Sequence, residues 1–302
     1  MTKIDSVEKR PVSIFNRLYH KLWIVVTLLI ASGALYASND VRLSASELHQ
    51  KLNQPGLLIL DSRSPQEYQL GHLPGALNLP ETWTYHNIET DGRIVQPAKI
   101  QTILRSLGID VDTQVVIYDN GEMIKAARAF WTLEVYGLNQ VKVLNQGYRS
   151  WLKNEFTVAK QTPQAQPSNY IPVINHQRLA TKLTTLIASK NPNQTIVDAR
   201  DEEAYLGHVS TAKRFGHIPN ALNIPASHNL NSTEQMKGLA AKAKLDGLYT
   251  TLPKQNKIIL YCDIGRASAT NYLALRELGY NVSNYDGSWK EWGNDLKLPI
   301  EK

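Results

Sequence analysis

Residues 57–80 read LLILDSRSPQEYQLGHLPGALNLP, and residues 195–225 read TIVDARDEEAYLGHVSTAKRFGHIPNALNIP. Both stretches begin with a short apolar run, continue with Asp-x-Arg, and end with Gly-His-x-Pro-x-Ala-Leu-Asn-x-Pro. The second stretch is eight residues longer between these landmarks, in a loop that contains Lys213 and Arg214. Landmarks that return in the same order indicate a tandem duplication.

Two further pairs of segments extend the repeat toward the end of the chain. QVVIYD at 114–119 corresponds to KIILYC at 257–262, and NQGYRSW at 145–151 corresponds to DGSWKEW at 286–292. The stretch TVAKQTPQAQPSNYIP contains three prolines and no clear periodicity, which is typical of a linker. The domain boundaries predicted from these landmarks are 39–156 for the first domain, 157–172 for the linker and 173–302 for the second domain.

Each copy alternates short apolar runs with longer helical patterns. Runs rich in branched residues predict buried parallel strands at 57–60, 115–118, 196–199 and 258–261. Helices are expected at 100–107, 126–136 and 268–278, the last two ending before a capping glycine, Gly137 or Gly279. Ser44 and Glu47 have the spacing of a capping box. The fold class predicted is therefore α/β, with two tandem domains, each a parallel sheet flanked by helices.

Length and composition exclude several classes of protein. The 302 residues are 42% hydrophobic and 20% charged, which is typical of a globular protein and excludes a mainly disordered, collagen-like or coiled-coil chain. The formal net charge is +6, and part of it lies in residues 1–37, where five basic residues face two acidic ones. The mildly basic remainder suits a small anionic substrate. Nucleic-acid binding is not indicated, because the sequence contains no stripe of Lys and Arg with interleaved aromatic residues.

The first 37 residues have the pattern of an export segment. Residues 1–21 are polar and positively charged, and residues 22–37 form a run of 16 largely apolar residues. A membrane-spanning helix usually needs ~20 apolar residues, whereas a signal peptide needs fewer, followed by small residues. We expect a cleaved signal peptide. The alternatives are an uncleaved N-terminal anchor and a buried helix. Either a signal or an anchor places the body in the periplasm or another extracytoplasmic compartment.

Cys262 is the single cysteine of the chain, which excludes an intramolecular disulfide and a cysteine-based zinc site. It follows a predicted buried strand and precedes a short loop with Gly265 and then a predicted helix. Backbone N–H groups of such a loop and the helix N-terminus favour a thiolate, and Arg266 adds a cation. These features point to a nucleophile, although a lone cysteine is more commonly a buried core residue.

The two copies resemble rhodanese domains, and residues 41–302 resemble the tandem-domain sulfurtransferases that use thiosulfate or 3-mercaptopyruvate. The resemblance is carried by the two repeated stretches quoted above, by the YC-x-x-G loop and by the final YDGSWKEWGNDLKLPIEK. It implies that Cys262 is the catalytic nucleophile of the second domain. Asp119 stands at the corresponding place of the first domain. An aspartate cannot carry a sulfane sulfur, so the resemblance implies a non-catalytic first domain.

The resemblance also implies a mechanism. The Cys262 thiolate would attack the outer sulfur of a donor such as thiosulfate, and a cysteine persulfide would remain. Cyanide, a thiol or a carrier protein would then remove the sulfur. This chemistry requires no cofactor and no metal, and the sequence contains neither a Walker loop nor an H-E-x-x-H motif.

The substrate-binding residues expected from the resemblance are those of the loop after the nucleophile, together with one arginine of the inserted loop: Asp263, Ile264, Gly265, Arg266, Ala267 and Arg214. The mercaptopyruvate branch typically has a serine where this chain has Ile264, which favours thiosulfate or another sulfane donor. Arg266 lies one place before the usual loop arginine. Arg214 is a candidate anion-binding group, or else part of a solvated basic loop. Asp198 and Arg200 are interpreted as structural support, a buried pair that ties the strand to the loop.

Two other functions remain open at this point. A sulfur carrier or partner-binding module would keep the persulfide but turn over slowly, and the unusual loop with Asp263 and a shifted Arg266 motivates that alternative. A phosphatase or arsenate-reducing relative would also use a loop cysteine and an arginine, but the spacing from Cys262 to Gly279 is the ordinary rhodanese one. The expected partners are a small anionic sulfur donor and a thiophilic acceptor.

Overall fold

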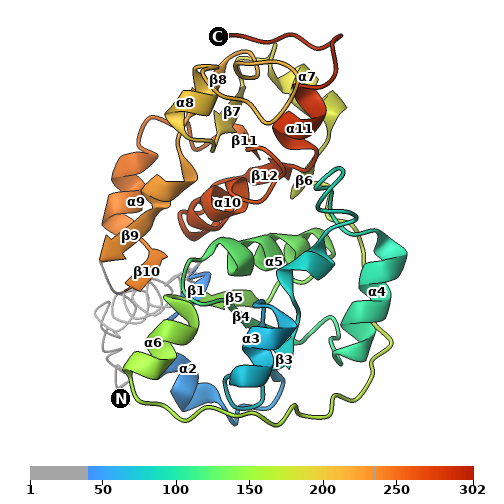
Figure 1. Cartoon of the computed structure of the whole chain (residues 1–302), viewed down its shortest axis with the longest axis vertical. Coiled ribbons are helices and arrows are strands. Elements are labelled where there is room, and N and C mark those ends of the chain that lie inside the picture. The colour runs from blue at the N-terminus through green and yellow to red at the C-terminus, as the bar shows by residue number, and fades with distance from the viewer. Residues whose placement is uncertain (1–39, 234–235) are drawn as a thin grey trace, which may run out of the picture. The chain divides into compact units, whose positions relative to one another are not determined.

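The computed structural model describes residues 40–233 and 236–302, and residues 39–302 form one compact unit (Figure 1). The predicted export segment, residues 1–37, lies outside the described residues. Within the described part of the chain, no helix combines the length and the apolar character that crossing a bilayer requires. The same residues contain no cluster of three or more His, Cys, Asp or Glu side chains placed to hold a metal ion.

The first half of the unit is built around a five-stranded parallel sheet. Its strands follow the spatial order β1-β5-β4-β2-β3. The strands are β1 (Arg42–Leu43), β2 (Leu57–Asp61), β3 (Leu77–Asn78), β4 (Gln114–Tyr118) and β5 (Val141–Leu144). The helices are α2 (Ala45–Lys51), α3 (Pro65–Leu70), η1 (Glu81–Thr84), α4 (Pro97–Ser106), α5 (Ile124–Val135) and α6 (Gly147–Lys153).

The second half repeats this topology. A second parallel sheet has the order β6-β12-β11-β7-β8, which corresponds strand by strand to the first. Its strands are β6 (Leu179–Ala180), β7 (Gln194–Asp198), β8 (Ala221–Asn223), β11 (Lys257–Tyr261) and β12 (Val282–Tyr285). Its helices are α7 (Lys182–Ala188), α8 (Glu202–Tyr205), η2 (Ala226–Asn229), α9 (Lys242–Leu248), α10 (Ser268–Glu277) and α11 (Ser288–Trp292). The predicted α/β class with two tandem domains is confirmed.

A hairpin of the second half is reduced in the first half to one antiparallel bridge, between Tyr85 and Ile94, which lies between η1 and α4. Strands β9 (Leu230–Thr233) and β10 (Met236–Leu239) pair in an antiparallel hairpin between η2 and α9. Its second strand reaches the first half, because the amide N–H of Leu239 donates to the Asn145 side chain at 2.8 Å. The sequence analysis did not predict this hairpin.

The predicted elements match the observed ones within a few residues. The four predicted strands correspond to β2, β4, β7 and β11, and the three predicted helices to α4, α5 and α10. The capping box of Ser44 and Glu47 is present at the start of α2. Gly137 and Gly279 have φ angles of +95° and +76°, the left-handed conformation expected of a glycine that ends a helix.

The two halves share one hydrophobic core. Helices α5 and α10 pack against each other between the two sheets (Figure 1). Phe130 of α5 and Tyr272 of α10 contact each other within a cluster of buried residues that includes β4 on one side and β11 on the other. The Tyr272 hydroxyl also donates to Glu134 at 2.5 Å. The second half therefore packs on the first through α10.

Candidate active site

Cys262 lies where β11 ends and the loop to α10 begins. Its side chain is 98% buried, and Cys262 is a free cysteine. The Ser268 hydroxyl lies 3.4 Å from the Cys262 Sγ, and the backbone N–H of Cys262 donates to the Ser288 hydroxyl at 3.3 Å. Strand β11 is buried and rich in branched residues. Cys262 follows it, at the carboxyl end of the parallel sheet, where binding sites of α/β folds lie.

The loop after the cysteine turns sharply at Gly265. The φ angle of Gly265 is +70°, and a Cβ at this position would lie 3.0 Å from Arg128 Nη1. The Gly265 carbonyl accepts hydrogen bonds from Arg128 Nη1 and from Asn284 Nδ2, each at 3.0 Å. Both the backbone conformation and the close approach require glycine, as the sequence predicted.

A cavity of about 340 Å³ opens beside the cysteine. Residues of both halves line it, with Glu122 and Ile124 from the first half and Leu230 and Lys237 from the hairpin of the second. The remaining lining residues also belong to the second half: Ala199, Arg200, Asp201, Ala226, Ser227, Cys262, Asp263, Ala267 and Thr270. The cavity therefore combines the nucleophile with both carboxylates and cations, and it is large enough for a small donor molecule.

Only two of the predicted loop residues, Asp263 and Ala267, line this cavity. Asp263 accepts a hydrogen bond from the Thr211 hydroxyl at 2.5 Å. Ile264 faces the first half instead, because a Cβ built on Gly92 would lie 2.6 Å from the Cβ of Ile264. Ile264, predicted to bind substrate, is therefore not among the residues that line the cavity.

Arg266 is bound by a carboxylate of the first half. Its Nε and Nη2 donate to the two oxygens of Glu81 at 2.6 and 2.9 Å, a bidentate ion pair across the two halves. These bonds to Glu81 raise the pKa of Arg266. Arg266 does not line the cavity and Glu81 compensates its charge, so its role in substrate binding stays a prediction.

The anion-binding role of Arg214 likewise stays a prediction. The Arg214 guanidinium donates to backbone carbonyls of Trp292, Asp295 and Leu298 at 2.6 to 2.8 Å. These contacts hold the end of the chain against the inserted loop, and Arg214 is absent from the cavity lining. Arg214 lies outside the cavity because the backbone carbonyls at the end of α11 and after it bind its guanidinium. A sequence contains no signal for those contacts.

Asp198 and Arg200 form the buried ion pair that was expected. Arg200 Nη2 lies 2.6 Å from Asp198 Oδ2, and both side chains are almost fully buried. The Tyr261 hydroxyl donates to the same carboxylate at 2.6 Å, which links the pair to the strand that precedes Cys262. Arg200 additionally lines the cavity.

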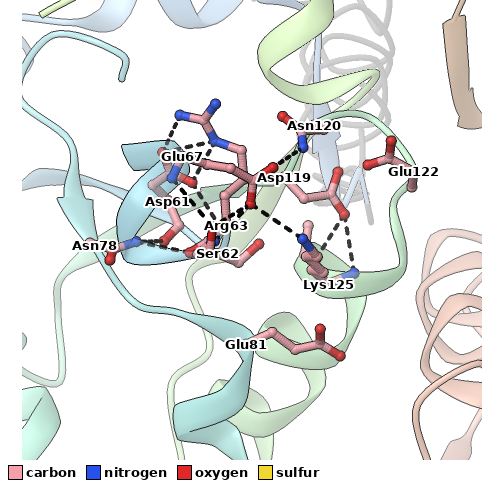
Figure 2. Close-up of polar contacts among 12 residues, drawn as sticks. Asp61, Ser62, Arg63, Glu67, Asn78, Glu81, Asp119, Asn120, Glu122 and Lys125 are labelled. Carbon is pink, nitrogen blue, oxygen red and sulfur yellow. Dashed lines mark hydrogen bonds and ion pairs between the residues drawn. The ribbon is translucent and has the colours of Figure 1, made fainter. Parts of the chain in front are cut away.

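The first half contains a corresponding loop that is filled by its own side chain (Figure 2). Asp119 follows β4 as Cys262 follows β11, and its carboxylate is fully buried. Burial raises the pKa of Asp119, and backbone hydrogen bonds oppose that effect. The donors are the backbone N–H groups of Gly121, Met123, Lys125 and Ala126, at 2.7 to 3.2 Å. The Asp119 carboxylate therefore accepts four backbone hydrogen bonds at the position that corresponds to Cys262.

Sequence reasoning missed several residues that contact the catalytic loop. Glu81 and Arg128 come from the first half, and Ser268 and Asn284 lie beside the loop within the second half. Two signals were available. Arg128 interrupts the apolar run AARAFW of a buried helix, and Asn284 interrupts a buried strand. Buried polar residues of this kind need a partner, but a sequence does not show which one.

Comparisons with known proteins place these observations in a family. The family model described as "Rhodanese-like domain" matches residues 44–154 and 179–295. The 3-mercaptopyruvate sulfurtransferase of Escherichia coli K12 is 29% identical over 274 residues, covering 85% of this chain and 96% of that protein. The thiosulfate sulfurtransferase of Corynebacterium glutamicum is 31% identical over 281 residues, covering 88% of this chain and 92% of that protein. The crystal structure of SseA from E. coli superposes with a TM-score of 0.73 at 27% identity, covering 83% of this chain and 99% of the other.

Proposed function

Because this chain belongs to the rhodanese family, we propose that it is a sulfurtransferase in which Cys262 accepts a sulfane sulfur and passes it to a thiophilic acceptor. The donor is thiosulfate or a related sulfane donor, with 3-mercaptopyruvate as the alternative. Cyanide, a thiol or a carrier protein serves as the acceptor. The persulfide of Cys262 is the intermediate between the two steps.

The observation that carries this proposal is the loop around Asp119. Met123 and Gly265 are left-handed residues that precede α5 and α10, with φ angles of +67° and +70°, and Gly121 of the first loop also has a positive φ, of +115°. Counting from Met123 and Gly265, the N–H donors of Lys125 and Ala126 correspond to those of Ala267 and Ser268. A persulfide on Cys262 would extend its outer sulfur to the place that the Asp119 carboxylate fills in the first half. Backbone N–H groups would then stabilise its negative charge.

The cavity chemistry supports a small donor with a modest negative charge. Lys237 supplies a cation to the lining, while Asp201, Asp263 and Glu122 supply carboxylates. Since Glu81 already compensates Arg266, the site holds fewer available cations than the sequence suggested. We therefore expect weak donor binding, with a high KM for thiosulfate, because the carboxylates oppose the approach of a dianion.

The test is sulfur transfer from thiosulfate to cyanide by the full chain, beside Cys262→Ser. The expected result is thiocyanate formation by the wild type only, with one added sulfur atom per chain in the intact mass after thiosulfate alone. A persulfide without turnover would favour the sulfur-carrier alternative, which the charge-compensated Arg266 also supports. Thiocyanate formation by Cys262→Ser at the wild-type rate would contradict the proposal.

We also propose that residues 1–37 direct the body of the protein out of the cytoplasm. The charged segment, the apolar run and the start of the family match at residue 44 support this. The test is fractionation of cells that express the full chain, with the N-terminal residue determined by mass spectrometry. An extracytoplasmic product that begins near residue 38 supports a cleaved signal. A cytoplasmic product that retains Met1 would refute export.

A further inference from the structure

A chain of buried hydrogen bonds connects the first half to the catalytic sulfur. Arg128 Nη1 and Asn284 Nδ2 both donate to the Gly265 carbonyl at 3.0 Å. The Ser268 hydroxyl lies 2.7 Å from Asn284 Oδ1 and 3.4 Å from Cys262 Sγ. The side chains of Arg128, Ser268 and Asn284 are all fully buried.

The contacts fix the orientation of the Asn284 amide. The Gly265 carbonyl can only accept a hydrogen bond, so the NH₂ group of Asn284 faces it, and the amide oxygen must face Ser268. The Ser268 hydroxyl carries one proton and has two neighbouring acceptors, the Asn284 oxygen and the Cys262 sulfur. Which acceptor it serves depends on the charge of the sulfur.

When the sulfur is neutral, the short contact to Asn284 is the better hydrogen bond, and the sulfur is left with the serine lone pairs. When the sulfur is a thiolate, it becomes the stronger acceptor, since a hydrogen bond to a charged group is roughly twice as strong as one between neutral groups. Rotation about the Cβ–Oγ bond redirects the proton without moving any heavy atom.

We propose that Ser268 is a catalytic residue of the sulfur transfer, a rotating donor that bonds Asn284 while the Cys262 sulfur is neutral and bonds that sulfur while it carries a charge. This role rests on the proposed function. It assigns Ser268 to the leaving group of the second step, because the inner sulfur regains its charge there.

The electron pairs balance in both steps. In loading, a lone pair of the thiolate forms a bond to the outer sulfur of the donor, and the bond from that sulfur to the rest of the donor breaks, its pair leaving with sulfite when the donor is thiosulfate. In discharge, a lone pair of the acceptor forms a bond to the outer sulfur, and the pair of the sulfur–sulfur bond returns to Cys262. During loading the Cys262 sulfur therefore loses the hydrogen bond from Ser268, and during discharge it regains that hydrogen bond.

The first test needs no sulfur donor. Cys262 is the single cysteine, so the rate of its alkylation by iodoacetamide reports its thiolate fraction directly. In Ser268→Ala we expect the midpoint of the rate against pH to move upward by about one pH unit, because a hydrogen bond to the thiolate is lost. Ser268→Thr keeps the hydroxyl and should retain the wild-type midpoint.

Ser283→Ala is the matched control. Ser283 is equally buried, next to Asn284 in β12, but its hydroxyl contacts the Ile258 carbonyl at 3.3 Å rather than the sulfur. The catalytic role of Ser268 is supported if the alkylation midpoint shifts in Ser268→Ala and stays unchanged in Ser283→Ala. Equal shifts in both variants, or no shift in Ser268→Ala, would overturn it.

The second test separates the two steps in single turnovers with thiosulfate and cyanide, at a pH above both midpoints. Ser268→Ala should discharge its persulfide about tenfold more slowly than the wild type, while loading is not slowed. Equal discharge rates in a protein that forms the persulfide would overturn the role of Ser268 and leave the proposed function intact. A midpoint shift without any persulfide would refute thiosulfate as the donor and leave the serine–sulfur contact supported.

Discussion

Glu67 is a single residue whose charge is held by several partners at once. It accepts hydrogen bonds from the Ser64 backbone and hydroxyl in a capping box and from the Asn120 amide at 2.5 Å, and Lys125 lies 3.5 Å away. Partial burial alone would raise the pKa of Glu67, but these partners outweigh burial and lower it to about 2. The same residue therefore caps α3 and contacts the loop that holds Asp119 (Figure 2).

This carboxylate predicts a specific acid dependence of stability. Its pKa is about 2 in the native state against an ordinary 4.5, so its stabilisation is complete above pH 4.5 and is lost as the pH falls toward 2. We expect a contribution of about 1 kcal/mol after solvent screening. Urea unfolding between pH 6 and 3 should show a steeper loss of stability in the wild type than in Glu67→Gln. Parallel curves would contradict the prediction.

The loops after β4 and β11 show what could be predicted at the level of elements. The strands, the turn at Gly265 and the helices were predicted close to their observed bounds. The signals were apolar runs and glycines, which predict well because local backbone preferences and burial determine these elements. The partners of Arg214 and Arg266 were not predictable. Arg214 binds carbonyls 78 or more residues away, and Arg266 binds a carboxylate 185 residues away. Long-range pairs of this kind depend on how finished elements pack.

The hydrogen bonds of the Asp119 carboxylate predict a stability effect of its loop. Asp119→Ala leaves four backbone N–H groups around an empty position, and we expect a loss of roughly 2–4 kcal/mol in the free energy of unfolding. Denaturant unfolding at neutral pH measures it. Asp112→Ala is the control, since Asp112 is exposed and lies in the same half. A loss no larger than that of the control would show that the carboxylate does not hold the loop.

At the scale of the whole molecule, the two halves act as one support for the sulfur. Arg128 is fully buried, and its guanidinium carbon lies 4.2 Å from the Tyr85 ring and 4.5 Å from the Trp131 ring. From this position in α5 it reaches the Gly265 carbonyl of the other half and lies 3.6 Å from Asp286. The first half thus contributes to the shape of the loop after Cys262 as well as to the core.

Arg128→Met tests that contribution. The methionine fills most of the space but leaves the Gly265 carbonyl with one donor fewer and Asp286 without its buried cation, and we expect a loss of about 3 kcal/mol in stability. Thiocyanate formation should fall at least tenfold under conditions where the variant is still folded, because the loop loses its fixed turn. Lys182→Met, which removes a partly exposed ion pair with Asp295 away from the cavity, should change neither quantity measurably. Full activity in a folded Arg128→Met variant would refute the prediction that Arg128 shapes the loop after Cys262.

The replacement of the first-half cysteine by Asp119 has a stoichiometric consequence. A chain with one thiol can hold one transferable sulfur, and no resolving thiol within the chain can convert the persulfide into an internal disulfide. The sulfite released when thiosulfate is added to unloaded protein, without an acceptor, therefore counts competent molecules one for one. The amplitude of that release measures the concentration of competent protein, so a preparation can be standardised by its own first turnover.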